Sequence, residues 1–217
     1  MTDRPPFAVP SADPERTITL GLLNAVQDDH KVTQRSVAKD LGIALGLANA
    51  YLKRCIKKGY IKLSRVPPNR YAYYLTPHGF AEKSRLTAEF LSQSFMFFRE
   101  AREQYTAIMA DCAARGWKRV AFCGSGDLAE IAGLCNKDTA IEVAAIVDGA
   151  ADDPEEASRA IRQVLSEIVG IEAVIVTDLK SPQATFNALA ASLPVDRILT
   201  PRLLGIARSM PALAKQE

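Results

Sequence analysis

The sequence has few of the residues that form metal and redox sites. Only four of its 217 residues are cysteines and only two are histidines. No two cysteines have the C-x-x-C spacing that zinc sites and thiol redox sites use. We therefore expect no metal site, and we expect reduced, mostly buried thiols at Cys55, Cys112, Cys123 and Cys135.

Long apolar runs are also missing. No stretch approaches the ~20 apolar residues that are needed to cross a bilayer. The first residues, MTDRPPFAVPSADPE, lack the apolar segment of a signal peptide. These absences predict a cytoplasmic protein without a membrane partner. The proline-rich composition of residues 1–13 predicts a disordered N-terminus.

Charge is distributed unevenly along the chain, although the net charge is only +2. Residues 1–115 carry 17 lysine and arginine residues against 11 acidic residues, whereas residues 116–217 carry 10 against 14. A basic half beside an acidic half is typical of a module that meets a polyanion, joined to a module with another task.

Three short helices are predicted in the basic half. Asp13, Pro14 and Glu15 supply the N-cap, the first-turn proline and the early acid of the first helix. The second helix begins at Thr33 and is broken by a glycine, and the third covers residues 44–58. Because the third helix has an apolar face and presents polar side chains on the other, the pair indicates a helix-turn-helix.

Two β-rich runs follow, residues 60–66 and 71–75, and they predict the hairpin wing of a winged helix. Residues 33–70 hold nine lysine and arginine residues against one acid. Each phosphate that such residues neutralise adds affinity for DNA of any sequence. We predict that residues 14–76 form a winged-helix domain that binds double-stranded DNA through Gln34, Arg35, Asn49, Lys53, Lys57, Arg65 and Arg70.

One resemblance agrees with this interpretation. The segment VTQRSVAKDLGIALGLANAYLKRCIKKGYIKL, followed by YAYYLTPHGFAEKSRLTAEFL, resembles the MarR-type winged-helix regulators found beside exopolysaccharide and lipopolysaccharide biosynthesis genes. It covers about residues 16–105 and is most specific over residues 74–87. Ala44 and Leu47 stand where that family tends to place a serine cap and a lysine. The resemblance implies a transcription regulator, of polysaccharide biosynthesis genes.

A long connecting helix is predicted over residues 77–115, because Thr76 and Pro77 can start it and Gly116 is the next breaker after its first turn. Large side chains recur along it at spacings of seven, with further aromatic residues beside them. We predict a homodimer, with burial of the same stripe against the chain's own C-terminal domain as the alternative. The predicted interface residues are Leu91, Phe95, Phe98 and Tyr105.

Residues 116–217 alternate between strand and helix patterns. Strands are expected at residues 119–123, 141–147, 171–177 and 197–200, with helices at residues 127–137, 154–169 and 182–193. This rhythm predicts a small, doubly wound parallel sheet of the Rossmann-like type. The predicted fold class is therefore α/β overall, with an N-terminal winged helix (α+β), a long connecting helix and this sheet.

A glycine turn joins the first strand and helix of that half. Residues 124–129 read G-x-G-x-x-A, and an acid follows the second strand. In dinucleotide-binding folds the glycines admit a diphosphate and the acid accepts from ribose hydroxyls. The sequence predicts a nucleotide site, against the alternative of a turn that only shapes the fold. The predicted site residues are Gly124, Ser125, Gly126, Asp127, Leu128, Asp148, Thr177 and Asp178.

Two further resemblances suggest a ligand. VAFCGSGDLAEIA with VAAIVD is similar to the nucleotide-binding domain of Rex-type redox repressors, which sense the NADH/NAD balance. It is equally similar to the sugar-nucleotide-binding domains of sugar acyltransferases. The candidate effectors are therefore NAD(H) and a nucleotide sugar, and the polysaccharide association of the basic half favours the nucleotide sugar.

No catalytic residue is predicted. Both histidines, His30 and His78, lie in the basic half, and hydride transfer or sugar chemistry would need a further substrate domain. The favoured interpretation is a DNA-binding regulator controlled by a nucleotide-type effector. The alternatives are a small nucleotide-dependent enzyme tethered to DNA, and a regulator whose C-terminal domain serves only assembly.

Overall fold

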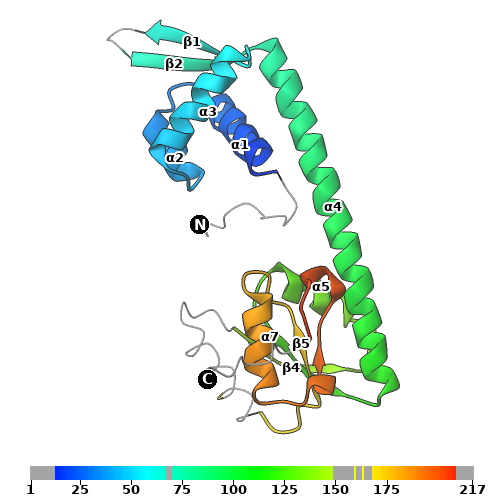
Figure 1. The fold of residues 1–217 in the computed structure, drawn as a ribbon. Helices are drawn as coiled ribbons and strands as arrows, with labels where there is room; N and C mark the ends of the chain where they lie inside the picture. The colour runs from blue at the N-terminus through cyan, green and yellow to red at the C-terminus, as the bar shows by residue number, and fades with distance from the viewer. Residues whose placement is uncertain (1–12, 67–69, 149–158, 160–162, 164–167, 209–217) are drawn as a thin grey trace. The chain divides into compact units, whose positions relative to one another are not determined.

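A computed structural model describes residues 13–66, 70–148, 159, 163 and 168–208. The chain divides into two compact units, Met1–Phe97 and Phe98–Glu217 (Figure 1). The division falls inside the long helix, whereas the sequence led us to expect a separate connecting helix and a C-terminal domain that begins at residue 116. Of residues 1–13, which were predicted to be disordered, residues 1–12 lie outside the described part and Asp13 is the N-cap of α1.

The N-terminal unit has the predicted winged-helix element order. Its first helix is capped by the Asp13 side chain, which accepts from the Glu15 N–H at 3.0 Å. Its second helix begins with a capping box, in which Thr33 and Ser36 each accept from the other's backbone N–H. The elements are α1 (Pro14–Asp28), α2 (Gln34–Asp40), α3 (Leu45–Lys57), β1 (Ile61–Val66) and β2 (Arg70–Leu75), and the two strands pair antiparallel.

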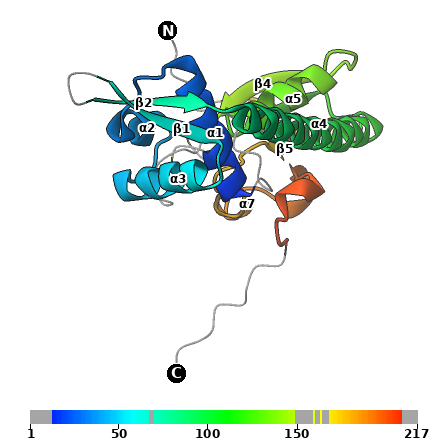
Figure 2. The same cartoon turned by 90° about the horizontal axis from the view of Figure 1, so that it is seen from above.

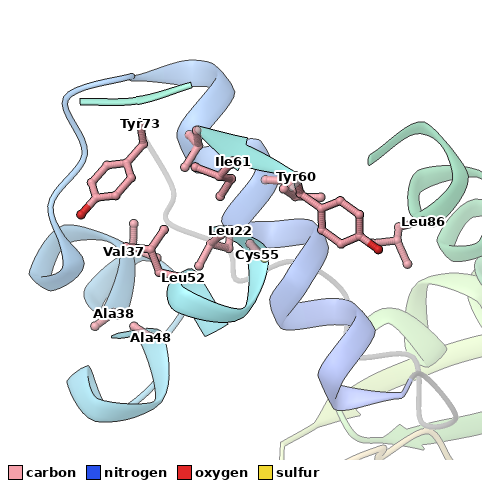
Figure 3. Packing of buried hydrophobic residues seen from close by; sticks show 12 residues of the cluster. Leu22, Val37, Ala38, Ala48, Leu52, Cys55, Tyr60, Ile61, Tyr73 and Leu86 are labelled. Carbon is pink, nitrogen blue, oxygen red and sulfur yellow. The ribbon is translucent and has the colours of Figure 1, made fainter. Parts of the chain in front are cut away.

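The core of this unit lies between the three short helices, the hairpin and the start of α4 (Pro77–Ala114) (Figure 3). Leu22 and Leu23 of α1 are fully buried in it. The Tyr60 ring points towards Leu86 of α4, as Figure 3 shows. Gly79 is required here, because a Cβ at this position would lie 2.0 Å from the Tyr60 carbonyl oxygen. The first turns of α4 are thus packed directly on the winged helix.

The C-terminal unit contains a four-stranded sheet in the order β4-β3-β5-β6, and all three strand pairs are parallel. Its strands are β3 (Arg119–Cys123), β4 (Glu142–Val147), β5 (Ala173–Val176) and β6 (Ile198–Leu199). The order reverses between β3 and β5, as in doubly wound sheets. The predicted α/β class and parallel sheet are confirmed. The helix predicted at residues 154–169 falls on a stretch of which only isolated residues are described.

Helices cover both faces of this sheet. Phe186 and Leu189 of α7 (Pro182–Ala190) pack against Cys123, Val174 and other residues of one face. The second half of α4 lies on the opposite side of the strands from α7 (Figures 1 and 2). There it meets α5 (Asp127–Cys135), and the Cys135 thiol contacts the Arg102 carbonyl oxygen at 3.5 Å. The end of the long helix is therefore part of the C-terminal core.

Tyr105 is the clearest consequence of this packing. Its side chain is fully buried, and its hydroxyl donates to the Val176 carbonyl oxygen at 2.9 Å. Burial holds the pKa of this phenol well above its usual range. The assignment of Tyr105 to a dimer interface is therefore wrong, because the residue fills the core of its own chain. Leu91, Phe95 and Phe98 are exposed in the single chain.

Among the described residues, no helix has the length and apolar character needed to cross a membrane.

We predict that Tyr105→Ala lowers the free energy of unfolding of the C-terminal unit by about 3 to 5 kcal/mol, because it empties an aromatic site in a closed core. Tyr105→Phe removes only the hydroxyl and should cost about 1 kcal/mol. The single tryptophan, Trp117, lies in this unit and reports its urea unfolding by fluorescence.

Leu134→Ala is the matched control, because Leu134 is 50% exposed on α5 and its truncation should change the free energy by less than about 1 kcal/mol. An unchanged unfolding transition in Tyr105→Ala would contradict the packing of α4 on the sheet.

Candidate DNA-binding face and glycine turn

The turn between α2 and α3 is fixed by backbone geometry. Gly42 has a φ of +62°, and the next residue, Ile43, donates from its N–H to the Ala38 carbonyl oxygen at 2.9 Å. Ala44 occupies the N-cap of α3 and gives no side-chain cap. The N-terminus of α3 therefore leaves backbone N–H groups without a capping side chain.

The outer face of α3 is basic. Ala48, Leu52 and Cys55 are buried against the core, as the helical spacing predicted. Lys53 and Lys57 are exposed, which is the placement expected of residues that neutralise phosphates. Their contact with DNA stays a prediction.

Asn49 lies differently from these lysines. It is half-buried, and its Oδ1 is enclosed without a hydrogen-bond partner in the described part of the chain. The helical spacing predicts that Asn49 projects outward with Lys53, but only part of this side chain is exposed and its Oδ1 is enclosed.

Several exposed residues of α3 were not singled out from the sequence. Arg54 is exposed and forms an ion pair with Glu15 of α1. Leu45 and Leu47 are 47% and 42% exposed in the first turn. The same helical periodicity that places Ala48 inside could have indicated that Leu47 faces outward.

The other predicted DNA contacts lie on α2 and the wing. Arg35 is exposed and Gln34 is half-buried. Arg70 begins β2, and Arg65 lies one residue before the end of β1. The side chains of both, like residues 67–69, lie outside the described part.

The wing is joined to the helices by the turn that follows α1. The Tyr73 N–H donates to the His30 carbonyl oxygen at 2.8 Å, and the His30 ring stacks on Tyr74 with 5.5 Å between ring centroids. His78 lies against Tyr60 at 4.9 Å. Both histidines therefore have packing roles in the winged helix.

The glycine turn, residues 124–129, lies at the carboxyl edge of the parallel sheet. Gly124 has a φ of +117°, and a Cβ there would lie 2.4 Å from the Asp178 backbone nitrogen. Its N–H donates to the Val147 carbonyl oxygen at 2.8 Å. The first glycine of the motif is thus required by the close approach of the loop after β5. This packing alone explains it.

The polar groups of Thr177 and Asp178 are used within the chain. Thr177 is buried, and its hydroxyl donates to the Gly124 carbonyl oxygen at 2.7 Å. One Asp178 oxygen accepts from the Lys180 N–H at 2.8 Å, and the other accepts from the Thr185 hydroxyl at 2.7 Å. Both residues lie at the predicted edge, but their side chains hold the loop and the start of α7.

The rest of the turn is more open. Ser125 and Asp148 are exposed, and the serine hydroxyl donates to a carboxylate oxygen of Asp148 at 2.5 Å. A Cβ on Gly126 would meet no atom within 4 Å, so the chain's own packing does not require this glycine. Gly126 is the N-cap of α5, with Asp127 in its first turn. The Leu128 side chain is buried in the core, which leaves only its backbone for a ligand.

Cys123 precedes the turn and is a core thiol. Burial raises its pKa to about 12, and the nearby carboxylates of Asp178 and Asp148 act in the same direction. A thiol with so high a pKa is protonated near neutral pH and is a poor nucleophile. In the described part of the chain, no group of three or more histidine, cysteine or acidic side chains is arranged to hold a metal ion.

Residues 15–62 match the family model described as winged helix-turn-helix DNA-binding. The N-terminal unit is a winged-helix DNA-binding domain. This match covers α1, α2, α3 and the start of the wing, and it includes the predicted contacts from Gln34 to Lys57. No curated protein matches the sequence.

The solved structures similar to this chain include two transcription regulators. The PcaV transcriptional regulator from Streptomyces coelicolor is 23% identical, with a TM-score of 0.37 over 46% of this chain and 74% of PcaV. MepR, a transcription regulator of the Staphylococcus aureus multidrug efflux pump MepA, is 24% identical, with a TM-score of 0.36 over 48% of this chain and 80% of MepR. Each likeness covers less than half of the chain.

Proposed function

We propose that the protein is a homodimeric transcription regulator of the MarR type, whose C-terminal domain binds a nucleotide-type effector. The observation that carries the proposal is the basic outer face of α3 in a winged-helix DNA-binding domain. The link to polysaccharide biosynthesis genes rests on the resemblance of residues 16–105 alone.

Electrostatics supports DNA as the polyanion that this domain meets. Lys53 and Lys57 are exposed on the helix that a helix-turn-helix places in the major groove. Each contact with a phosphate releases bound counterions and makes the affinity depend on salt. Because the C-terminal half is acidic, this attraction belongs to the N-terminal unit.

We predict that Lys53→Ala with Lys57→Ala weakens DNA binding and reduces the slope of log affinity against log salt concentration by about two, since two phosphate contacts are lost. Filter binding with the full chain at several salt concentrations measures both quantities. Lys137→Ala with Lys180→Ala is the control, because it removes the same charge from exposed positions of the C-terminal unit. Equal slopes in the two double variants would refute the assigned face.

The dimer is proposed on the exposed apolar stripe of α4. Leu91, Phe95 and Phe98 recur at spacings of four and three and thus share one side of the helix. All three are exposed in the single chain, and Phe95 is 60% exposed. Exposed apolar side chains gathered on one face favour a protein partner, and a second copy would supply the second recognition helix that paired half-sites need.

We predict that Phe95→Glu converts the dimer into monomers, because the charge would have to be buried in the interface. Light scattering should give twice the 23.6 kDa chain mass for the wild type and one chain mass for the variant. Ala107→Glu, a change at an exposed position elsewhere on α4, should leave the dimer intact. A monomeric wild type would exclude this interface.

The effector is proposed at the open part of the glycine turn. Gly126 has free space around it, and it starts a helix whose first N–H groups can bind a phosphate. Asp148 is exposed beside it and can accept from ribose hydroxyls. The candidate ligands are nucleotide sugars and NAD(H).

Two hydrogen bonds within the C-terminal unit support a route by which an effector at the turn would act on α4. Thr177 hydrogen-bonds to Gly124 of the turn, and its neighbour Val176 hydrogen-bonds to Tyr105 of α4. A ligand that shifts the turn would therefore act on the peptide that anchors α4. If that peptide has two positions and the ligand binds more tightly to the protein in one of them, the ligand shifts the equilibrium between them and acts as an effector.

We predict that a UDP-sugar, a GDP-sugar, NADH or NAD raises the melting temperature of the wild type. A ligand at a hundredfold excess over its Kd stabilises the folded state by roughly 2.7 kcal/mol. Asp148→Ala should reduce this shift without unfolding the ligand-free protein, and Asp138→Ala, an exposed acid away from the turn, should not.

If none of these nucleotides changes the melting temperature, the prediction is contradicted and the C-terminal domain is assigned to assembly. The internal hydrogen bonds of Thr177 and Asp178 favour that second candidate, since they explain part of the motif without a ligand. Turnover of a bound nucleotide would instead indicate an enzyme tethered to DNA.

A further inference from the structure

The first two turns of α3 present apolar surface where a recognition helix meets bases. Leu45 and Leu47 are 47% and 42% exposed, and Gly46 and Ala50 are exposed as well. None of these four residues has a side chain that can donate or accept a hydrogen bond. Leu47, Ala50, Lys53 and Lys57 follow one another at spacings of three, three and four.

This apolar surface is continuous with the basic face. Lys53 and Lys57 occupy the later turns of α3 on the side away from the buried residues. In a helix-turn-helix the residues at the start of the recognition helix contact base edges. The lysines that follow can then reach the phosphates. The exposed Leu47 therefore lies at the part of the helix that enters the groove.

Packing within the chain does not account for Gly46. A Cβ at this position would meet no atom within 4 Å, although glycine inside a helix is about 1 kcal/mol less favourable than alanine. Together with the small side chain of Ala50, it lets another surface come close to the helix backbone.

Only one major-groove feature matches an apolar surface. The bases present hydrogen-bond donors and acceptors there, and thymine alone adds an exposed methyl group. We infer that Leu47, together with Ala50, reads thymine 5-methyl groups, so that the half-site has T·A pairs where the start of α3 enters the major groove. This inference rests on the proposed DNA-binding function and adds to it the class of base that is recognised.

The test uses the full chain and a duplex selected by it from a random library. Thymines of the selected half-site are replaced one at a time by deoxyuridine, which removes only the methyl group. Loss of one buried methyl contact should weaken binding roughly fourfold at one or two positions. The same replacement outside the half-site should have no effect.

Protein variants assign the effect to the helix. Leu47→Ala should reduce the ratio of thymine to uracil affinity at the sensitive position towards one, and it should leave the fold intact because the side chain is exposed. Leu134→Ala, which truncates a leucine of α5 that is 50% exposed, should keep the fourfold ratio. Lys57→Ala should weaken binding to both duplexes equally.

The outcomes separate this inference from the proposed function. Tight, salt-dependent binding with equal affinity for thymine and uracil duplexes would overturn methyl recognition and leave the DNA-binding function standing. A fourfold ratio that persists in Leu47→Ala would overturn the assignment to this residue. Absence of DNA binding at low salt would overturn both.

Discussion

The long helix α4 contributes buried side chains to two separate cores, and the rest of the structure depends on this constraint. At its start, α4 is held by Thr76, whose hydroxyl caps the Gly79 N–H and donates to the Gly59 carbonyl oxygen. Near its other end, Tyr105 and Met109 are fully buried in the C-terminal unit. Neither core is complete without α4. A change in its packing in one unit therefore acts on an element that the other unit also needs.

This shared helix gives the proposed regulation a physical basis. The Tyr105 hydroxyl binds the backbone at the end of β5, one residue before Thr177 closes the glycine turn. Val176, which anchors α4, is thus the neighbour of Thr177, and Thr177 hydrogen-bonds to the glycine turn at which the effector is proposed. Coupling between α4 and the turn needs a loop with two positions and a ligand that prefers one of them. A long signalling path through the sheet is not needed.

Most of the fold could be predicted, because its helices and strands follow from patterns among residues that are close in sequence. The apolar spacing of α3, the proline and cap at α1, and the alternation of strands and helices after Trp117 each depend on near neighbours in sequence. Tyr105 could not be assigned, because a repeat of seven along a helix shows that a face is buried without showing which partner buries it. The role of Thr177 depends on Gly124, which is distant in sequence, so residue type and motif position were insufficient to assign it.

The close approach at Gly124 affects how such motifs are interpreted in other sequences. A backbone loop occupies the space that a side chain would need, so this glycine is fixed by the sheet whether or not a ligand is bound. A lineage that lost its nucleotide would still keep this glycine in the motif. The informative position is the second glycine, Gly126, which has free space around it and which selection could replace once no ligand required it. Its identity across related chains would record whether the site is still in use.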